Sequence, residues 1–119
     1  MVFEIRGAVP EALAARFGGY CKPDIATFQL GVTPQLFLPA NMDRVNLGIW
    51  NFSGNTVVIS PFFDAALTKG INVPSLGGFV SFDIYEDTIL PAWEWWGIAS
   101  VAATEIVILS VVRERRKVE

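Results

Sequence analysis

Alternation of apolar and polar side chains near the middle of the chain is the feature that most restricts its fold. In RVNLGIWNF (44–52) every second residue from Val45 to Ile49 is apolar, which is the period of a strand with one buried face. The turn residues Ser53-Gly54-Asn55 follow, and TVVIS (56–60) resumes the strand pattern. Residues 44–60 are therefore predicted to form a β-hairpin.

Similar strand signals occupy most of the remaining chain. Residues 61–70 are predicted to form a loop or one helical turn, and 71–78, with a proline and two glycines, an edge segment or a turn. Short strands between turn residues predict an all-β fold, an antiparallel β-sandwich or a jelly-roll-like barrel. Since the last strand is apolar on both faces, we expect it to lie centrally in a sheet. The other predicted strands are 25–32, 35–39, 79–85 and a final pair, 88–100 with 104–113.

The N-terminal residues differ from the rest. Pro10, the segment EALAARF and Gly18-Gly19 predict one short helix, with residues 18–23 as a connector. About two turns are too short to be stable alone, so we expect this arm to dock on its own domain or on a neighbour. Its acidic residues and the lack of a continuous apolar run argue against a signal peptide. The predicted organisation is residues 1–24 as the arm with its short helix, 25–114 as the β-sandwich domain, and 115–119 as a basic C-terminal tail.

The chain has unusually little charge for a soluble domain. Charged residues make up 18% and apolar residues 52% of its 119 residues, whereas about 25% charged is typical. Such a chain either spans a membrane or hides much of its outside against partners. The net charge of −3 argues against a nucleic-acid partner. Residues 113–119 (RERRKVE) hold four basic side chains, and a solvated end is the favoured interpretation of this tail.

The residue inventory argues against catalysis. The chain has no histidine and one cysteine, Cys21, which excludes Ser-His-Asp and Cys-His arrangements, zinc clusters and an intrachain disulfide. Four carboxylates, Asp83, Glu86, Asp87 and Glu94, lie close in sequence, but their spacing matches no known calcium loop or glycosidase pair. We interpret them as turn and surface acids. We therefore predict a protein that is not an enzyme, with no catalytic, cofactor-binding or metal-binding residues.

The tryptophans are the most distinctive side chains. Trp93, Trp95 and Trp96 lie within four residues, and Trp50 belongs to another predicted strand. In a strand through 88–100, Trp93 and Trp95 share one face and Trp96 points to the other. We expect Trp96 in the core and the Trp93–Trp95 face at a protein–protein contact, because aromatic residues are enriched at interfaces. Stacking on a glycan is the alternative for this face.

Residues 95–112, followed by RERRK, also resemble a membrane span with an aromatic belt and a basic flank. The apolar run is only marginally long enough, and Glu105 lies near its middle at a cost of about 2.5 kcal/mol or more. It is also rich in isoleucine and valine, so strands are favoured and a single-span membrane protein is the weaker alternative.

Three segments carry a family resemblance: FLPANMDRVNLGIWNFSGNTVVISP, INVPSLGGFVSFDIYED and WWGIASVAATEIVILSVVRE. Together they resemble small structural proteins of tailed-bacteriophage virions, over roughly residues 36–114. The resemblance implies a β-sandwich subunit of the decoration (cement) or head or tail accessory type. The matching positions are Asn41, Arg44, Leu47, Ile49, Asn51, Val57, Ile59, Gly77-Gly78, Ile98-Ala99-Ser100 and Val107 to Glu114.

The expected function is therefore a non-enzymatic virion structural protein that stabilises a capsid through protein–protein contacts, without cofactors. Its expected partners are the major capsid protein or other virion proteins and further copies of itself, as a trimer, with neither nucleic acid nor a membrane as partner. It is expected in the virion, after assembly in the host cytoplasm. A glycan-binding module for host attachment is the alternative. The expected interface residues are Phe3, Arg6, Leu13, Phe17, Trp50, Trp93, Trp95, Arg113, Arg115 and Arg116.

Overall fold

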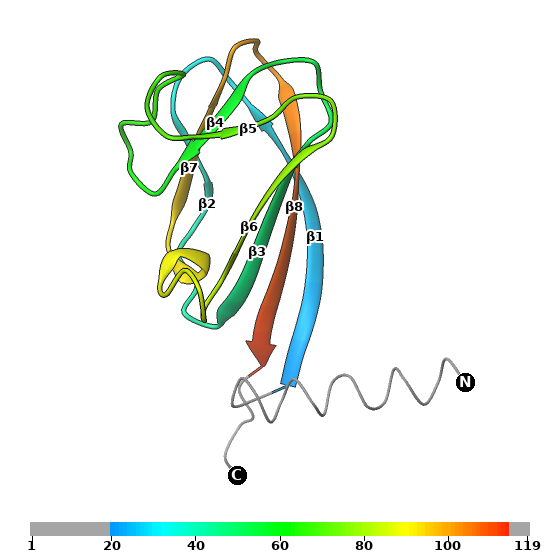
Figure 1. Ribbon diagram of the computed structural model, residues 1–119, viewed down its shortest axis with the longest axis vertical. Coiled ribbons are helices and arrows are strands. Elements are labelled where there is room, and N and C mark those ends of the chain that lie inside the picture. The colour runs from blue at the N-terminus through cyan, green and yellow to red at the C-terminus, as the bar shows by residue number, and fades with distance from the viewer. Residues whose placement is uncertain (1–19, 115–119) are drawn as a thin grey trace, which may run out of the picture.

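The computed structural model describes residues 20–114, which form two four-stranded antiparallel sheets packed face to face (Figure 1). The predicted β-sandwich is therefore confirmed. The predicted helix of the arm and the tail at 115–119 lie outside the described residues. Sheet A has the order β1 (Tyr20–Leu30), β8 (Thr104–Glu114), β3 (Arg44–Asn51), β6 (Gly78–Asp83). Sheet B has the order β2 (Gln35–Leu38), β7 (Trp95–Ala99), β4 (Val57–Ser60), β5 (Ile71–Val73), and a short 3-10 helix, η1 (Leu90–Ala92), precedes β7.

The predicted hairpin over 44–60 is wrong, because its two strands belong to different sheets. β3 pairs with β8 and β6 in sheet A, and β4 pairs with β7 and β5 in sheet B. The buried side chain of Asn51 stabilises the crossing: its amide donates to the carbonyls of Asn55 (2.9 Å) and Val73 (3.1 Å), and its carbonyl oxygen accepts from the Ser53 amide. Alternation shows which side chains are buried, and both strands bury theirs between the sheets.

The predicted final pair is wrong for the same reason. β7 lies in sheet B and β8 in sheet A, so the loop at 100–103 joins the two layers. Residues 88–94 are not a strand, since they include η1 and the turns around it. The predicted central position of the last strand is confirmed, because β8 lies between β1 and β3.

The first strand is longer than predicted. β1 begins at Tyr20, so residues 20–23 belong to sheet A and not to a connector. The edge segment near 71–78 is confirmed as β5, at the edge of sheet B, and residues 61–70 form a loop. The division into arm, sandwich and tail stays a prediction.

The core lies between the sheets. Burial of this apolar surface is the main favourable contribution to folding. Trp95 of β7 stacks on Phe82 of β6 with 4.8 Å between ring centroids. The largest buried members are Leu30, Leu47, Ile49, Val57, Ile59, Val73, Trp95 and Ile106.

Candidate interaction surface

The outer face of sheet A carries uncharged side chains across all four strands. The strand register places these residues in two rows that run across the sheet, on the side away from sheet B. Ile25 is 66% exposed and Phe79 43% exposed, while the larger side chains of the central strands are half-buried. We call this surface the open face. Its rows are Thr27, Val107, Trp50, Phe79 and Ile25, Leu109, Gly48, Ser81.

Aromatic rings cover one side of the open face. The Trp50 ring lies 4.4 Å from Phe79 and 6.3 Å from Phe52 between centroids. Gly48 makes room for this arrangement, since a Cβ there would lie 2.6 Å from Cε2 of Phe79. The Phe79 ring therefore lies over the glycine backbone and packs against the Trp50 ring at an angle of 30°.

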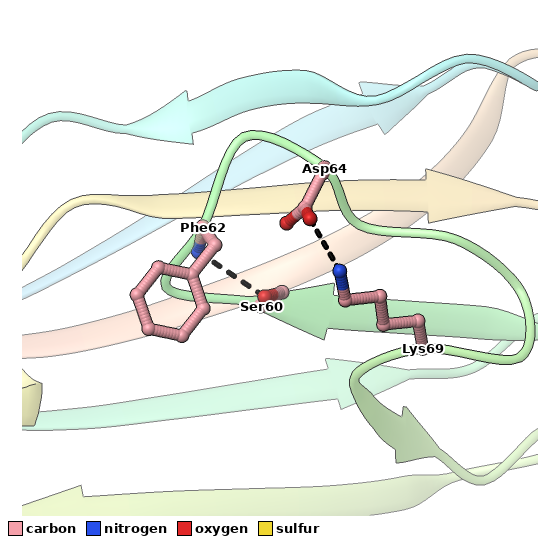
Figure 2. Close-up of polar contacts among 4 residues, drawn as sticks. All are labelled: Ser60, Phe62, Asp64 and Lys69. Atoms are coloured by element: carbon pink, nitrogen blue, oxygen red, sulfur yellow. Dashed lines mark hydrogen bonds and ion pairs between the residues drawn. The ribbon is translucent and has the colours of Figure 1, made fainter.

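The outer face of sheet B is also apolar, but the chain covers it. Ala65, in the loop between β4 and β5, packs with Val58 and Ile98 in a small buried cluster. The Asp64–Lys69 ion pair lies within the same loop, and its hydrogen bond lowers the pKa of Asp64. At its start the Phe62 amide donates to the Ser60 hydroxyl (3.1 Å; Figure 2). The two outer faces differ, because a loop shields sheet B whereas the open face of sheet A stays partly exposed.

Arg44 organises the end of the sandwich beside η1. Its guanidinium is almost fully buried and donates to the carbonyl oxygens of Pro91 (2.6 Å), Trp93 (2.8 Å) and Pro39 (3.0 Å). Burial lowers the pKa of Arg44. A planar guanidinium presents several donors in fixed directions, so this one side chain joins the end of β2 to the segment before β7.

Two adjoining apolar pockets lie on this end. The larger has a volume of about 430 Å³ and includes Met42, Ile89 and Trp93 in its walls. The smaller, about 180 Å³, shares Ile89 and Trp93 with it. The Trp93 ring is held in place because its Nε1 donates to the Pro61 carbonyl (3.0 Å). An apolar side chain of a partner fits such pockets better than a polar one.

The tryptophans do not form the predicted shared face. Trp95 is fully buried in the core, and its Nε1 donates to the Leu90 carbonyl (2.9 Å). Its expected role at an interface is therefore wrong, because it presents no surface to a partner. Trp93 lies outside the strand and is 42% exposed. Trp96, expected in the core, packs against the cluster on the outer face of sheet B.

The other expected interface residues are dispersed. Trp50 lies on the open face, near the end of β3. Arg44 lies at the opposite end of β3, where its guanidinium donates to the Trp93 carbonyl. Arg113 forms an ion pair with Asp43 (3.4 Å). Hence the structure places Trp50 and Trp93 on separate surfaces. The remaining expected residues, Phe3, Arg6, Leu13, Phe17, Arg115 and Arg116, lie outside the described residues.

Two of the four clustered acids, Asp83 and Asp87, accept hydrogen bonds within a turn. Asp83 accepts hydrogen bonds from the amides of Tyr85 (2.8 Å) and Glu86 (2.9 Å), and Asp87 accepts from the Asp83 amide (2.9 Å). Between residues 20 and 114 no group of three or more acidic, cysteine or histidine residues is arranged to hold a metal ion. Burial raises the pKa of Cys21, so its thiol is less ionised than a free one.

The segment that resembles a membrane span is two strands in different sheets, β7 and β8. Within the described range, no helix is long and apolar enough to cross a membrane.

Sequence reasoning missed Arg44 and Phe79 as key residues of these surfaces. The alternation that begins at Val45 predicts an outward side chain for Arg44, but a β-bulge between Arg44 and Asn46 changes its direction, and the side chain is buried. No local sequence pattern predicts that bulge. Phe79 was treated only as the start of a strand, and its importance depends on the cross-strand position of Gly48.

Comparisons with known proteins identify no family. No protein-family model matches the chain, and no curated protein matches it. A chain in a solved structure of Bacillus endospore appendages, described as a novel family of disulfide-linked pili, covers 80% of this chain and 88% of its own length. The two are 15% identical, with a TM-score of 0.47.

Proposed function

We propose that the chain is a non-enzymatic structural subunit that packs its open face against another protein. The observation that carries this proposal is the open face itself, which is uncharged over four strands and partly exposed. Contiguous exposed apolar surface of this kind marks interaction sites. The aromatic residues Trp50 and Phe79 are of the type enriched in interface cores. The matching partner surface is flat, apolar and uncharged.

The size of the open face indicates that it does not act alone. Four strands about 4.8 Å apart and two rows of outward residues span roughly 260 Å². A stable complex buries about 800 Å² on each partner. A second contact is therefore needed, and the N-terminal arm, with Phe3, Leu13 and Phe17, is the segment that we propose for it.

The finer form of the proposal follows the sequence resemblance. The subunit is a decoration or cement protein of a tailed-bacteriophage virion, and its partner is the major capsid protein. A subunit of this kind needs a low surface charge and an aromatic contact surface, both of which the chain has. It needs no catalytic groups.

The test is co-sedimentation of the full chain with shells assembled from the major capsid protein of the same virion. We expect the chain to sediment with the shells, Phe79→Lys to lose binding by tenfold or more, and deletion of residues 1–19 to abolish it. Phe63→Lys is the matched control, because Phe63 is also an exposed aromatic residue (74%) but belongs to the loop over sheet B. Binding that is equal for the two lysine variants would refute the role of the open face.

One observation favours the glycan-binding alternative: Trp50, Phe52 and Phe79 form a cluster of aromatic rings, and the exposed faces of such rings are stacking surfaces. Quenching of tryptophan fluorescence by members of a sugar panel, lost in Phe79→Lys, would support this alternative. A flat titration over the panel would remove it.

A further inference from the structure

β1 forms one edge of sheet A, and the directions of its backbone groups follow from the register. Along an antiparallel strand, successive residues bond alternately to one side and the other. The Ile84 amide donates to the Val45 carbonyl, so the odd-numbered residues of β3 bond to β6 and the even-numbered ones to β8. Carried through the β3–β8 and β8–β1 registers, this places the odd-numbered residues of β1 at its open edge.

Two observations agree with this assignment. The Arg113 amide donates to the Asp43 carbonyl, which directs the odd-numbered residues of β8 towards β3. Pro23, an odd-numbered residue of β1, has no N–H, and prolines within sheets occur where that missing donor faces an edge. Ile25, Thr27 and Gln29 therefore present both their N–H and C=O groups at the open edge.

The open stretch has a definite end on each side. On the N-terminal side the stretch ends at Pro23, which has no N–H to donate. On the C-terminal side it ends at Gly31, whose backbone groups are already bonded: its amide donates to Oε1 of Gln35 (2.8 Å), and its carbonyl accepts from the Ala99 amide (2.9 Å). Three alternate residues, Ile25, Thr27 and Gln29, thus keep their N–H and C=O groups available for a partner strand.

We propose that two copies of the chain pair antiparallel through this edge, with Thr27 on the twofold axis. Thr27 then lies opposite itself, Ile25 lies opposite Gln29 of the second copy, and each of these pairs exchanges two hydrogen bonds. Pro23 falls opposite Gly31, so the residue without a donor faces one whose groups are already bonded. Threonine opposite threonine is also a favourable cross-strand pair.

Other registers leave groups unbonded. An axis at Ala26 places Gln29 opposite Pro23, whose missing N–H leaves the Gln29 carbonyl without a donor. An axis at Phe28 places Ile25 opposite Gly31, whose groups are occupied. Axes between residues bring odd-numbered residues opposite even-numbered ones and break the hydrogen-bond alternation.

The other three edges of the sandwich are less suitable among the described residues. β2 and β5 are short, with four and three residues, and the register of β2 is irregular. On β6, the Asp83 amide and carbonyl both bond to Asp87, which shortens its free edge. Natural sheets protect edges by such means, and β1 has this protection only near Pro23.

The pairing aligns the open faces of the two copies on one side of an eight-stranded sheet. It doubles the open face to roughly 520 Å², closer to the area of about 800 Å² that one side of a standard interface buries. The pairing does not depend on the partner proposed above, and it replaces the trimer expected from the sequence with a twofold dimer.

Disulfide trapping in the full chain tests the register. In a Cys21→Ser background, Thr27→Cys places two cysteines about 5.5 Å apart between Cα atoms, within the range of a disulfide. Ile25→Cys is the matched control, because its two copies are offset by four residues, roughly 13 Å along the strands. We expect mild oxidation to trap a dimer with Thr27→Cys at least tenfold faster than with Ile25→Cys. Equal trapping overturns the register.

Charged substitutions at Thr27, on the twofold axis, test the pairing without a covalent cross-link. By sedimentation velocity we expect a dimer for the natural chain and folded monomers for Thr27→Lys and Thr27→Glu, each of which places like charges opposite each other. An equimolar mixture of the two variants should recover the dimer. The proposal is overturned if the natural chain is monomeric or trimeric, or if the mixture stays monomeric. It is also overturned if the dimer forms only after residues 1–19 are removed. Co-sedimentation of a monomeric natural chain with the shells would separate this failure from failure of the proposed function.

Discussion

Replacing Arg44 tests how far one buried cation stabilises the end of the sandwich beside η1. Arg44→Met keeps most of the length of the side chain but removes the donors to the carbonyls of Pro39, Pro91 and Trp93. Leaving the buried Pro91 carbonyl without a donor costs about 1–3 kcal/mol, and the part-buried carbonyls of Pro39 and Trp93 cost less each. Part of this cost is offset because the variant no longer pays the desolvation penalty of a buried guanidinium. We expect a net loss of about 3 kcal/mol in the free energy of unfolding.

Urea unfolding, followed by tryptophan fluorescence, measures this loss. With an m value of roughly 1.5 kcal/mol per molar urea for a domain of this size, the midpoint should fall by about 2 M. Arg44→Lys should lose about half as much, because an ammonium does not present a planar fork of donors to three carbonyls. Arg113→Met is the control. Its ion pair with Asp43 is partly exposed, so its removal should cost less than about 1 kcal/mol.

A loss below about 1 kcal/mol for Arg44→Met, at an unchanged m value, would refute this reasoning. It would mean that water or a rearranged backbone satisfies the three carbonyls in the variant. A loss for Arg113→Met equal to that for Arg44→Met would show that charge in general, and not the three bonds, is responsible.

Three further substitutions follow from the same geometry. Gly70→Ala should destabilise the fold by about 2–4 kcal/mol in urea unfolding, because the φ of Gly70 is 141° and a Cβ would lie 2.7 Å from the Ile59 carbonyl oxygen. Gly54→Ala is the control and should be nearly neutral, because a Cβ at Gly54 meets nothing within 4 Å. Asn51→Ala should cost about 2–4 kcal/mol in thermal or urea unfolding, since it leaves buried carbonyls unbonded at the crossing between sheets. Gly48→Ala should displace the Phe79 ring and reduce the near-ultraviolet circular dichroism of its stack with Trp50, with a change in stability below about 1 kcal/mol; an unchanged spectrum would contradict the packing described for the open face.

Local sequence patterns determined the class of fold and the positions of most strands. Alternation around Leu47 and Ile49 identified the buried side of β3, and the doubly apolar pattern of 104–113 placed β8 centrally. These features are local, because the period of side chains along a strand depends only on the backbone of that strand. The absence of histidine likewise restricted the possible chemistry without any structure.

Strand partners and the candidate surface required the tertiary structure. A turn such as 53–55 joins strands equally well within one sheet or between two, so the hairpin prediction failed although the strands were correct. The Trp95 side chain entered the core because residues 88–94 turn before β7 begins. The open face exists because Phe79, Trp50 and Val107 come from three separate strands. Their proximity depends on hydrogen bonds between distant segments, which no local pattern encodes.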